Sequence, residues 1–181
     1  MTIHRQSVEQ IINRCKKLNV KTVAGGPLFT MEYAAYADKI DHLVLNEAEV
    51  TLPDFIKDLK SGNTKHIYKS DIFPDIIDSP IPLWNLINLK KYASMSIQYS
   101  RGCPFHCDFC NVTSLFGRKM RKKTAPQVIG ELNALYDAGY RGSIFFVDDN
   151  FIGTINSLKN ELLPALTEWK KTRPEMYFFT E

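Results

Sequence analysis

Short apolar runs alternate with segments of helical periodicity along most of this 181-residue chain. Strands that are separated by helices in this way lie parallel in a sheet, with the helices packed on its faces. The sequence therefore predicts an α/β fold. The expected strands are 20–24, 42–45, 95–99, 143–147 and 176–180, and the expected helices are 7–18, 31–38, 51–60, 125–138 and 157–171.

Local signals refine three of these elements. Ser7 with Gln10, and Thr124 with Gln127, have the spacing of a capping box, so each pair predicts the start of a helix. Pro164 falls inside the last expected helix. Because proline has no backbone N–H, we expect it to kink that helix or to leave a carbonyl without its helical partner.

A stretch with several prolines divides the chain. Residues 63–93 include Pro74, Pro80 and Pro82 but keep apolar side chains, which is typical of an ordered linker. The two strands before it are too few for a stable open α/β domain, and the three strands after it are the beginning of a β/α barrel. We therefore expect a partial α/β domain at 1–62, a linker at 63–93 and the N-terminal half of a barrel at 94–181.

Three cysteines lie within eight residues, at Cys103, Cys107 and Cys110. They follow the strand 95–99, and catalytic groups of β/α barrels lie at the carboxyl ends of strands. A loop this short can fold three thiolates around one metal centre. Iron–sulfur clusters usually have four cysteine ligands, so three would leave one iron open to a substrate or cofactor.

With Phe109 and the flanking Ser100–Pro104, this loop resembles the cluster motif of radical S-adenosylmethionine enzymes, in the subgroup with a cobalamin-binding domain. The resemblance implies a [4Fe–4S] cluster on Cys103, Cys107 and Cys110, with S-adenosylmethionine bound at the open iron. It implies reductive cleavage of S-adenosylmethionine to a 5′-deoxyadenosyl radical, with electrons from a flavodoxin- or ferredoxin-type reductant. The expected reaction is methylation or another radical modification of a small molecule or lipid.

The same resemblance identifies the two halves of the chain. Residues 1–62 resemble the C-terminal half of a flavodoxin-like cobalamin-binding domain, and 94–181 resemble the first three units of a partial TIM-like barrel, so the chain looks truncated at both ends. Gly25 and Gly26 stand where the family's strand lies against the nucleotide tail of cobalamin. The stretch 45–51 stands where the family often has Gly-Glu-Gly-Glu, with both glycines replaced. A plain strand-to-helix turn is the alternative for Gly25 and Gly26.

Asp148, Asp149 and Asn150 follow the second strand of the expected barrel. By the resemblance, they stand where the family contacts the methionine amino group, and carboxylate or amide oxygens accept hydrogen bonds from an ammonium. The alternative is an acidic loop that caps the next helix. Glu181, after the third strand, stands at another site position of the family.

Two other functions remain open. The chain could be a catalytically incomplete fragment or pseudoenzyme that binds only the cluster, or that needs a partner chain, since open sheet edges favour association. Alternatively, His106 could join the three thiols in a zinc-binding module.

Composition excludes several broad classes. The net charge of +3 points to no particular partner, and the basic run 118–123 is expected to be a solvated loop rather than a nucleic-acid surface. No apolar run is long enough to cross a bilayer, and the N-terminus has no apolar signal core. Four cysteines, three of them in one motif, do not form a disulfide framework. These features predict a cytoplasmic protein.

Overall fold

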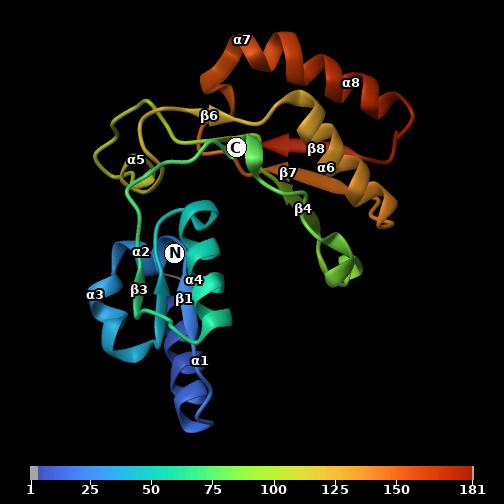
Figure 1. Ribbon diagram of the computed structural model, residues 1–181. Helices are drawn as coiled ribbons and strands as arrows, with labels where there is room; N and C mark the ends of the chain where they lie inside the picture. Colours follow the sequence, from blue (N-terminus) through green and yellow to red (C-terminus); the bar gives the residue numbers. More distant parts are fainter. Residues whose placement is uncertain (1–3, 181) are drawn as a thin grey trace. The chain divides into compact units, whose positions relative to one another are not determined.

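The computed structural model describes residues 4–180 and divides into two compact units, Met1–Pro74 and Asp75–Glu181 (Figure 1). The boundary falls inside the stretch 63–93. Each unit has its own parallel sheet and its own apolar core.

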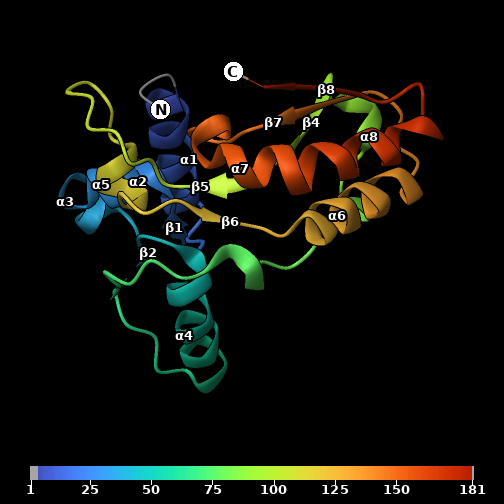
Figure 2. The same ribbon diagram turned by 90° about the horizontal axis from the view of Figure 1, so that it is seen from above.

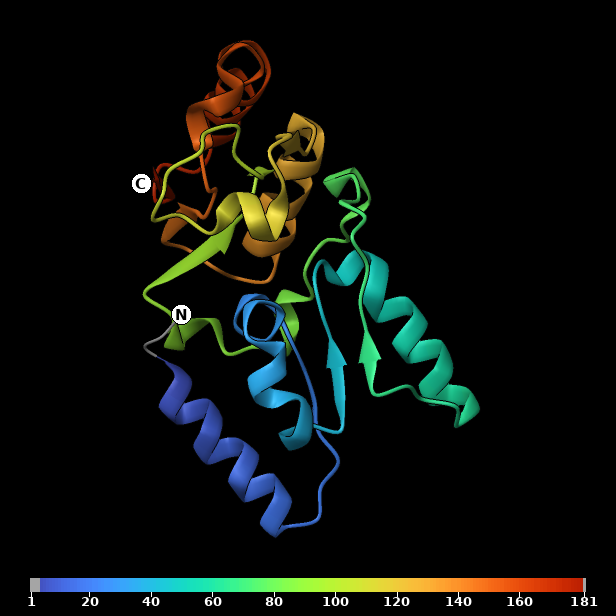
Figure 3. The same ribbon diagram turned by 90° about the vertical axis from the view of Figure 1, so that its left-hand side faces the viewer.

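The first unit is a three-stranded parallel sheet in the order β1-β2-β3, with helices on both faces. One face packs Leu43 and Leu45 against Ile12 of α1 and Tyr36 of α3. The other face packs Val44 against α4. Figure 3 shows α1 (blue) and α4 (teal) on opposite sides of the strands. The elements are α1 (Arg5–Lys17), β1 (Val23–Gly25), α2 (Pro27–Met31), α3 (Tyr33–Tyr36), the 3-10 helix η2 (Ala37–Lys39), β2 (His42–Val44), α4 (Ala48–Ser61) and β3 (Ile67–Tyr68).

Three expectations for this unit are corrected. The helix α1 begins at Arg5 and has no side-chain cap, so Ser7 does not start it. The single helix expected at 31–38 is instead three short ones, which begin at Pro27 and break at Glu32. The strand β3 was not expected, because two residues are too few to show a pattern.

The second unit is built on a parallel sheet in the order β4-β7-β8. Its helices α6 and α8 cover one face, where Ile144 of β7 and Leu132 of α6 are fully buried. Figure 2 shows α6 and α8 beside each other, both on the same side of β7 and β8. On the other face, Phe145 stacks on Phe179 with 4.9 Å between ring centroids. The main elements are β4 (Ser94–Ile97), α6 (Ala125–Asp137), β7 (Ser143–Phe146), α7 (Ile155–Ser157), the π-helical η7 (Leu158–Leu162), α8 (Leu163–Lys171) and β8 (Tyr177–Thr180).

Two local signals in this unit are confirmed. Thr124 and Gln127 form a reciprocal capping box at the start of α6. The helix that contains Pro164 is irregular, because the turn just before the proline is π-helical. A proline cannot supply the amide that a regular α-helix needs, and a π-type turn accommodates that loss.

The stretch 75–93 is ordered by apolar contacts within the second unit. Ile76 is fully buried, and Trp84 and Leu89 pack against the core of this unit. Its elements are the 3-10 helices η3 (Ile76–Asp78), η4 (Trp84–Leu86) and η5 (Leu89–Lys91). Among residues 4–180, no helix has both the length and the apolar composition required to span a membrane.

Candidate metal centre

The cysteine loop is closed at its base by two short antiparallel strands, β5 (Ser100–Arg101) and β6 (Arg121–Lys122). The Lys123 N–H donates to the Tyr99 carbonyl at 2.8 Å and extends this pairing. All three cysteines therefore lie in one loop, 102–120, which connects β5 to β6 at the carboxyl end of β4. The loop also contains α5 (Val112–Phe116) and a tight turn in which Cys110 N–H donates to the Cys107 carbonyl at 3.0 Å.

Gly102 fixes the start of this loop. Its φ is +91°, and a Cβ at this position would lie 2.8 Å from the Lys119 carbonyl oxygen and 3.1 Å from that of Phe116. Both the backbone conformation and the crowding require glycine here. The next residue, Cys103, donates its N–H to the Gly117 carbonyl at 3.3 Å. The first thiol is thus attached to a defined point at the base of the loop.

In the part of the chain that the structure describes, none of the three thiols is in a disulfide. Cys103 and Cys110 are half-buried and Cys107 is exposed. Within residues 4–180, no three histidine, cysteine, aspartate or glutamate side chains are grouped closely enough to hold a metal ion, and this includes His106. The donor set fits an iron–sulfur centre, because three free thiols lie on one accessible loop. All three donors lie within eight residues, so the loop can close around a metal as it binds, because metal binding and local folding are coupled.

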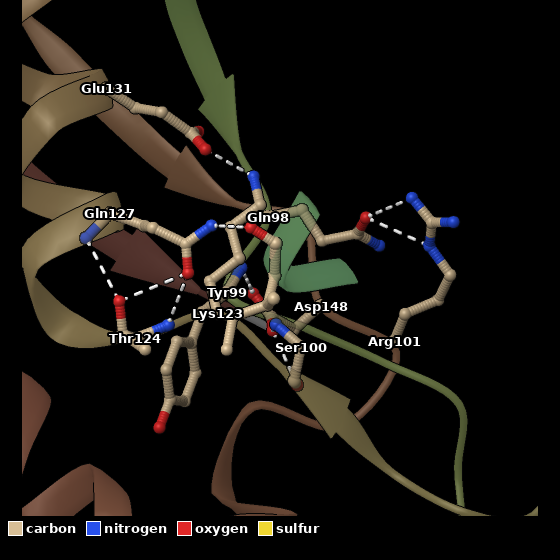
Figure 4. A network of polar contacts seen from close by, with 10 residues as sticks. Gln98, Tyr99, Ser100, Arg101, Lys123, Thr124, Gln127, Glu131 and Asp148 are labelled. Carbon is tan, nitrogen blue, oxygen red and sulfur yellow. Dashed lines mark hydrogen bonds and ion pairs between the residues drawn. The ribbon is translucent and has the colours of Figure 1, made fainter. Parts of the chain in front are cut away.

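The end of β7 is joined to the start of this loop through Asp148. One carboxylate oxygen accepts hydrogen bonds from the backbone N–H and the hydroxyl of Ser100, the latter at 2.6 Å, and the other accepts the Tyr99 N–H at 3.1 Å (Figure 4). Burial raises the pKa of Asp148, and these hydrogen bonds oppose the rise. The carboxylate therefore holds β4 and β7 together at their carboxyl ends.

The two residues after Asp148 continue this contact along the loop. The carboxylate of Asp149, which is exposed, accepts the Gly102 N–H at 3.4 Å. The Nδ2 atom of Asn150 lies 3.9 Å from the Cys103 sulfur. The sequence predicted that these residues lie at the same strand ends as the thiols. It did not predict the contact of Asp149 with Gly102 or that of Asn150 with Cys103.

Two side chains of the basic run 118–123 are buried in the second unit. Lys123 forms a buried ion pair with Glu131 of α6, also visible in Figure 4. Arg121 is buried and donates to the Phe116 carbonyl at 2.8 Å, and Lys122 pairs with Glu161 at 3.1 Å. The expectation of a solvated loop is therefore wrong for Arg121 and Lys123. No sequence pattern identified Glu131 as a buried residue that pairs with Lys123, although it lies next to Leu132 on the inward face of its helix.

In the first unit, Gly25 and Gly26 have distinct structural reasons to be glycine. A Cβ on Gly25 would lie 2.4 Å from the Val44 carbonyl oxygen of the adjacent strand, so Gly25 permits close strand packing. Gly26 has a φ of +85° and open space where a Cβ would lie. At one replaced glycine position, Asn46 has a φ of +64°, so asparagine keeps the left-handed conformation there. Glu181 lies outside the described residues.

Comparisons with known proteins decide the family. No protein-family model matches the chain. An uncharacterized methyltransferase of Synechocystis sp. is 40% identical over 176 residues, which cover 94% of this chain and 32% of that protein. Hopanoid C-2 methylase of Rhodopseudomonas palustris is 36% identical over 175 residues, which cover 94% of this chain and 33% of that protein. The chain belongs to the cobalamin-binding subgroup of the radical S-adenosylmethionine family.

The fold agrees with this membership. The structure of the cobalamin-dependent S-adenosylmethionine radical enzyme OxsB, with aqua-cobalamin and S-adenosylmethionine bound, matches 98% of this chain with a TM-score of 0.65 at 20% identity, and the match covers 28% of that chain. The expected fold class is confirmed: part of a flavodoxin-like domain precedes the first β/α units of a partial barrel. This radical S-adenosylmethionine family chain spans about a third of the length of the curated relatives named above.

Proposed function

We propose that Cys103, Cys107 and Cys110 hold a [4Fe–4S] cluster at whose open iron S-adenosylmethionine binds. The observation that carries the proposal is the placement of three free thiols on a single loop at the carboxyl end of β4, beside the acidic end of β7. When bound, the cluster supplies the electron that cleaves S-adenosylmethionine to methionine and a 5′-deoxyadenosyl radical. The chain's own residues position the thiols and receive the methionine part of the cofactor.

The residues after β7 divide this work. By the resemblance, Asp148, Asp149 and Asn150 stand where the family contacts the methionine amino group, and the sequence does not indicate which of the three makes the contact. The two oxygens of Asp148 already accept three hydrogen bonds from Tyr99 and Ser100. Asp149 is exposed and accepts one long hydrogen bond from Gly102. We therefore assign the ammonium contact to Asp149 and a positioning role to Asp148.

A cobalamin contact at Gly26 is part of the same proposal. Gly26 directly precedes α2 and has a positive φ and open space beside its Cα, which allows a bulky ligand to approach the backbone. Gly25 lies next to it but is already in contact with β2, so we assign it support of the strand rather than direct binding. Bound cobalamin would carry the methyl group in a radical methylation.

The whole protein's reaction is proposed from its relatives. Methyltransferases and a hopanoid methylase are among the proteins most similar to this chain. We propose methylation of a small molecule or lipid in the reducing cytoplasm, with electrons from a flavodoxin- or ferredoxin-type reductant. The thiols require such a compartment, since oxidation would remove the thiolate donors.

The test is release of 5′-deoxyadenosine from S-adenosylmethionine by the iron- and sulfide-reconstituted chain with a chemical reductant under anaerobic conditions. We expect release from the wild-type chain and from Cys15→Ala, whose thiol lies in the other unit. We expect none from Cys107→Ala. Equal release from Cys107→Ala and the wild-type chain would contradict the proposal.

A second candidate is a chain that binds the cluster without turnover. It is favoured by the open side of the barrel portion, where a cavity of about 270 Å³ between β8 and α8 is lined by apolar residues such as Phe146, Leu166 and Phe178. In the described residues, β8 pairs only with β7, so the outer edge of β8 has no strand partner there. This candidate predicts a reducible cluster in the reconstituted chain and no 5′-deoxyadenosine.

A further inference from the structure

Asn150 occupies a defined position between the end of β7 and the cysteine loop. It precedes the 3-10 helix η6 (Phe151–Thr154), and its carbonyl accepts the Gly153 N–H at 3.2 Å. Its side-chain Nδ2 is directed to the Cys103 sulfur at 3.9 Å, within the range for a hydrogen bond to sulfur. An amide nitrogen only donates, so a thiolate at Cys103 is its natural acceptor.

The Asn150 amide is confined on its other side. A Cβ on Gly153 would lie 2.9 Å from Asn150 Nδ2 and 2.3 Å from the Met120 sulfur. Because Gly153 has no side chain, the Asn150 amide and the sulfur of Met120, at the far end of the cysteine loop, fit beside its Cα. Cys103 is itself fixed by its N–H bond to Gly117. Both partners of the contact are thus held by the backbone around them.

We propose that Asn150 donates a hydrogen bond to the Cys103 sulfur of the bound cluster and raises the cluster's reduction potential. Reduction adds negative charge to the cluster and its sulfurs. A donor at a cluster sulfur stabilises the reduced form more than the oxidised form, and hydrogen bonds to sulfur are a main determinant of cluster potential. Asn150 is accordingly a tuning residue, distinct from the ammonium contact assigned to Asp149.

The inference rests on the proposed cluster and is tested by the midpoint potential of the reconstituted 181-residue chain. The potential is followed by electron paramagnetic resonance during an anaerobic redox titration. Asn150→Leu removes the donor at similar volume, and Asn150→Asp replaces it with an isosteric acceptor. Asn160→Leu is the matched control, because Asn160 is exposed on the π-helical turn.

For Asn150→Leu we expect about a tenfold smaller ratio of reduced to oxidised cluster at a given ambient potential, a shift of about 59 mV to more negative values for a one-electron couple. Asn150→Asp should shift further in the same direction, since a carboxylate repels the added charge. Asn160→Leu should match the wild-type chain. The readout is a potential at equal iron content, so a purely structural role for Asn150 would not move it.

The possible results distinguish failure of the Asn150 proposal from failure of the cluster proposal. Wild-type and Asn150 variants with equal iron content and equal potentials would overturn the role of Asn150 and leave the cluster proposal standing. Loss of iron from both Asn150 variants but not from Asn160→Leu would also overturn it, because Asn150 would then retain the metal rather than tune it. A wild-type chain that takes up no iron and sulfide would overturn both proposals.

Discussion

Asp148 accepts hydrogen bonds from both the backbone N–H and the hydroxyl of Ser100. The two residues are 48 positions apart, and the contact joins the ends of β4 and β7. Asp149 and Asn150 then contact Gly102 and Cys103 in order. The second β/α unit of the barrel therefore determines where the first thiol lies, which makes the strand ends a single structural support for the cysteine loop.

Replacement of Asp148 by alanine should weaken that support. The substitution leaves the Tyr99 and Ser100 N–H groups without their acceptor, and an unsatisfied buried donor costs about 1–3 kcal/mol. We expect a lower free energy of unfolding in urea and fewer irons per chain after reconstitution. Asp137→Ala, at an exposed position near the end of α6, should change neither. Wild-type iron retention in Asp148→Ala would refute the supporting role.

A methyl group at Gly102 should displace the start of the loop. Gly102 and Gly139 have similar positive φ angles, +91° and +93°, but only Gly102 has carbonyl oxygens where a Cβ would lie. Gly139→Ala therefore measures the conformational cost alone, about 1–2 kcal/mol. Gly102→Ala should cost more and should also reduce iron uptake. The account fails here if the two variants are equally stable and bind equal iron.

The buried pair of Lys123 and Glu131 should show strong coupling. Lys123→Met leaves a buried carboxylate without its partner, which typically costs about 3–5 kcal/mol near neutral pH. The double variant Lys123→Met, Glu131→Met removes both charges and should recover most of that loss. Urea unfolding of the two single variants and the double variant gives the coupling energy, and purely additive effects would contradict the buried pairing.

The same pair should give a pH-dependent stability. Burial raises the pKa of Glu131 above its ordinary value of 4.5, and Lys123 opposes the rise. At pH values between the ordinary pKa of the unfolded chain and the raised pKa of the folded chain, the native state binds more protons than the unfolded state. The free energy of unfolding therefore falls as pH rises above about 4.5, and it levels off once Glu131 is ionised in the native state. In Glu131→Gln this fall should be smaller, and the part that remains comes from Asp148 and Asp149, whose pKa values burial also raises. Parallel pH profiles for the two proteins would contradict the raised pKa.

The sequence predicted the parts of the fold that depend on repeated patterns. The five expected strands lie close to β1, β2, β4, β7 and β8, and the Thr124 capping box is present. The Ser7 signal failed because the helix begins earlier, at Arg5, and its N-cap residue His4 makes no side-chain cap hydrogen bond. The strands β3, β5 and β6 are only two residues long and depend on partners distant in sequence, so no local pattern could reveal them.

The candidate site was predictable in its chemistry but not in its contacts. Spacing identified the three cysteines, and strand position identified the residues after β7. The specific pairing of Asp148 with Ser100 and of Asn150 with Cys103 depends on the register of β4 with β7, in which Ile97 lies opposite Phe146. A register is set by packing across the whole sheet, and a single sequence does not specify it.

The central claim is that the three thiols hold one iron–sulfur cluster. The most direct measurement is the iron and acid-labile sulfide content of the anaerobically reconstituted chain, compared with its single cysteine-to-alanine variants. We predict about four irons per chain, with loss of the cluster in Cys103→Ala, Cys107→Ala and Cys110→Ala and its retention in Cys15→Ala. A wild-type chain that holds stoichiometric zinc and no iron, or iron that persists in all three loop variants, would contradict the account.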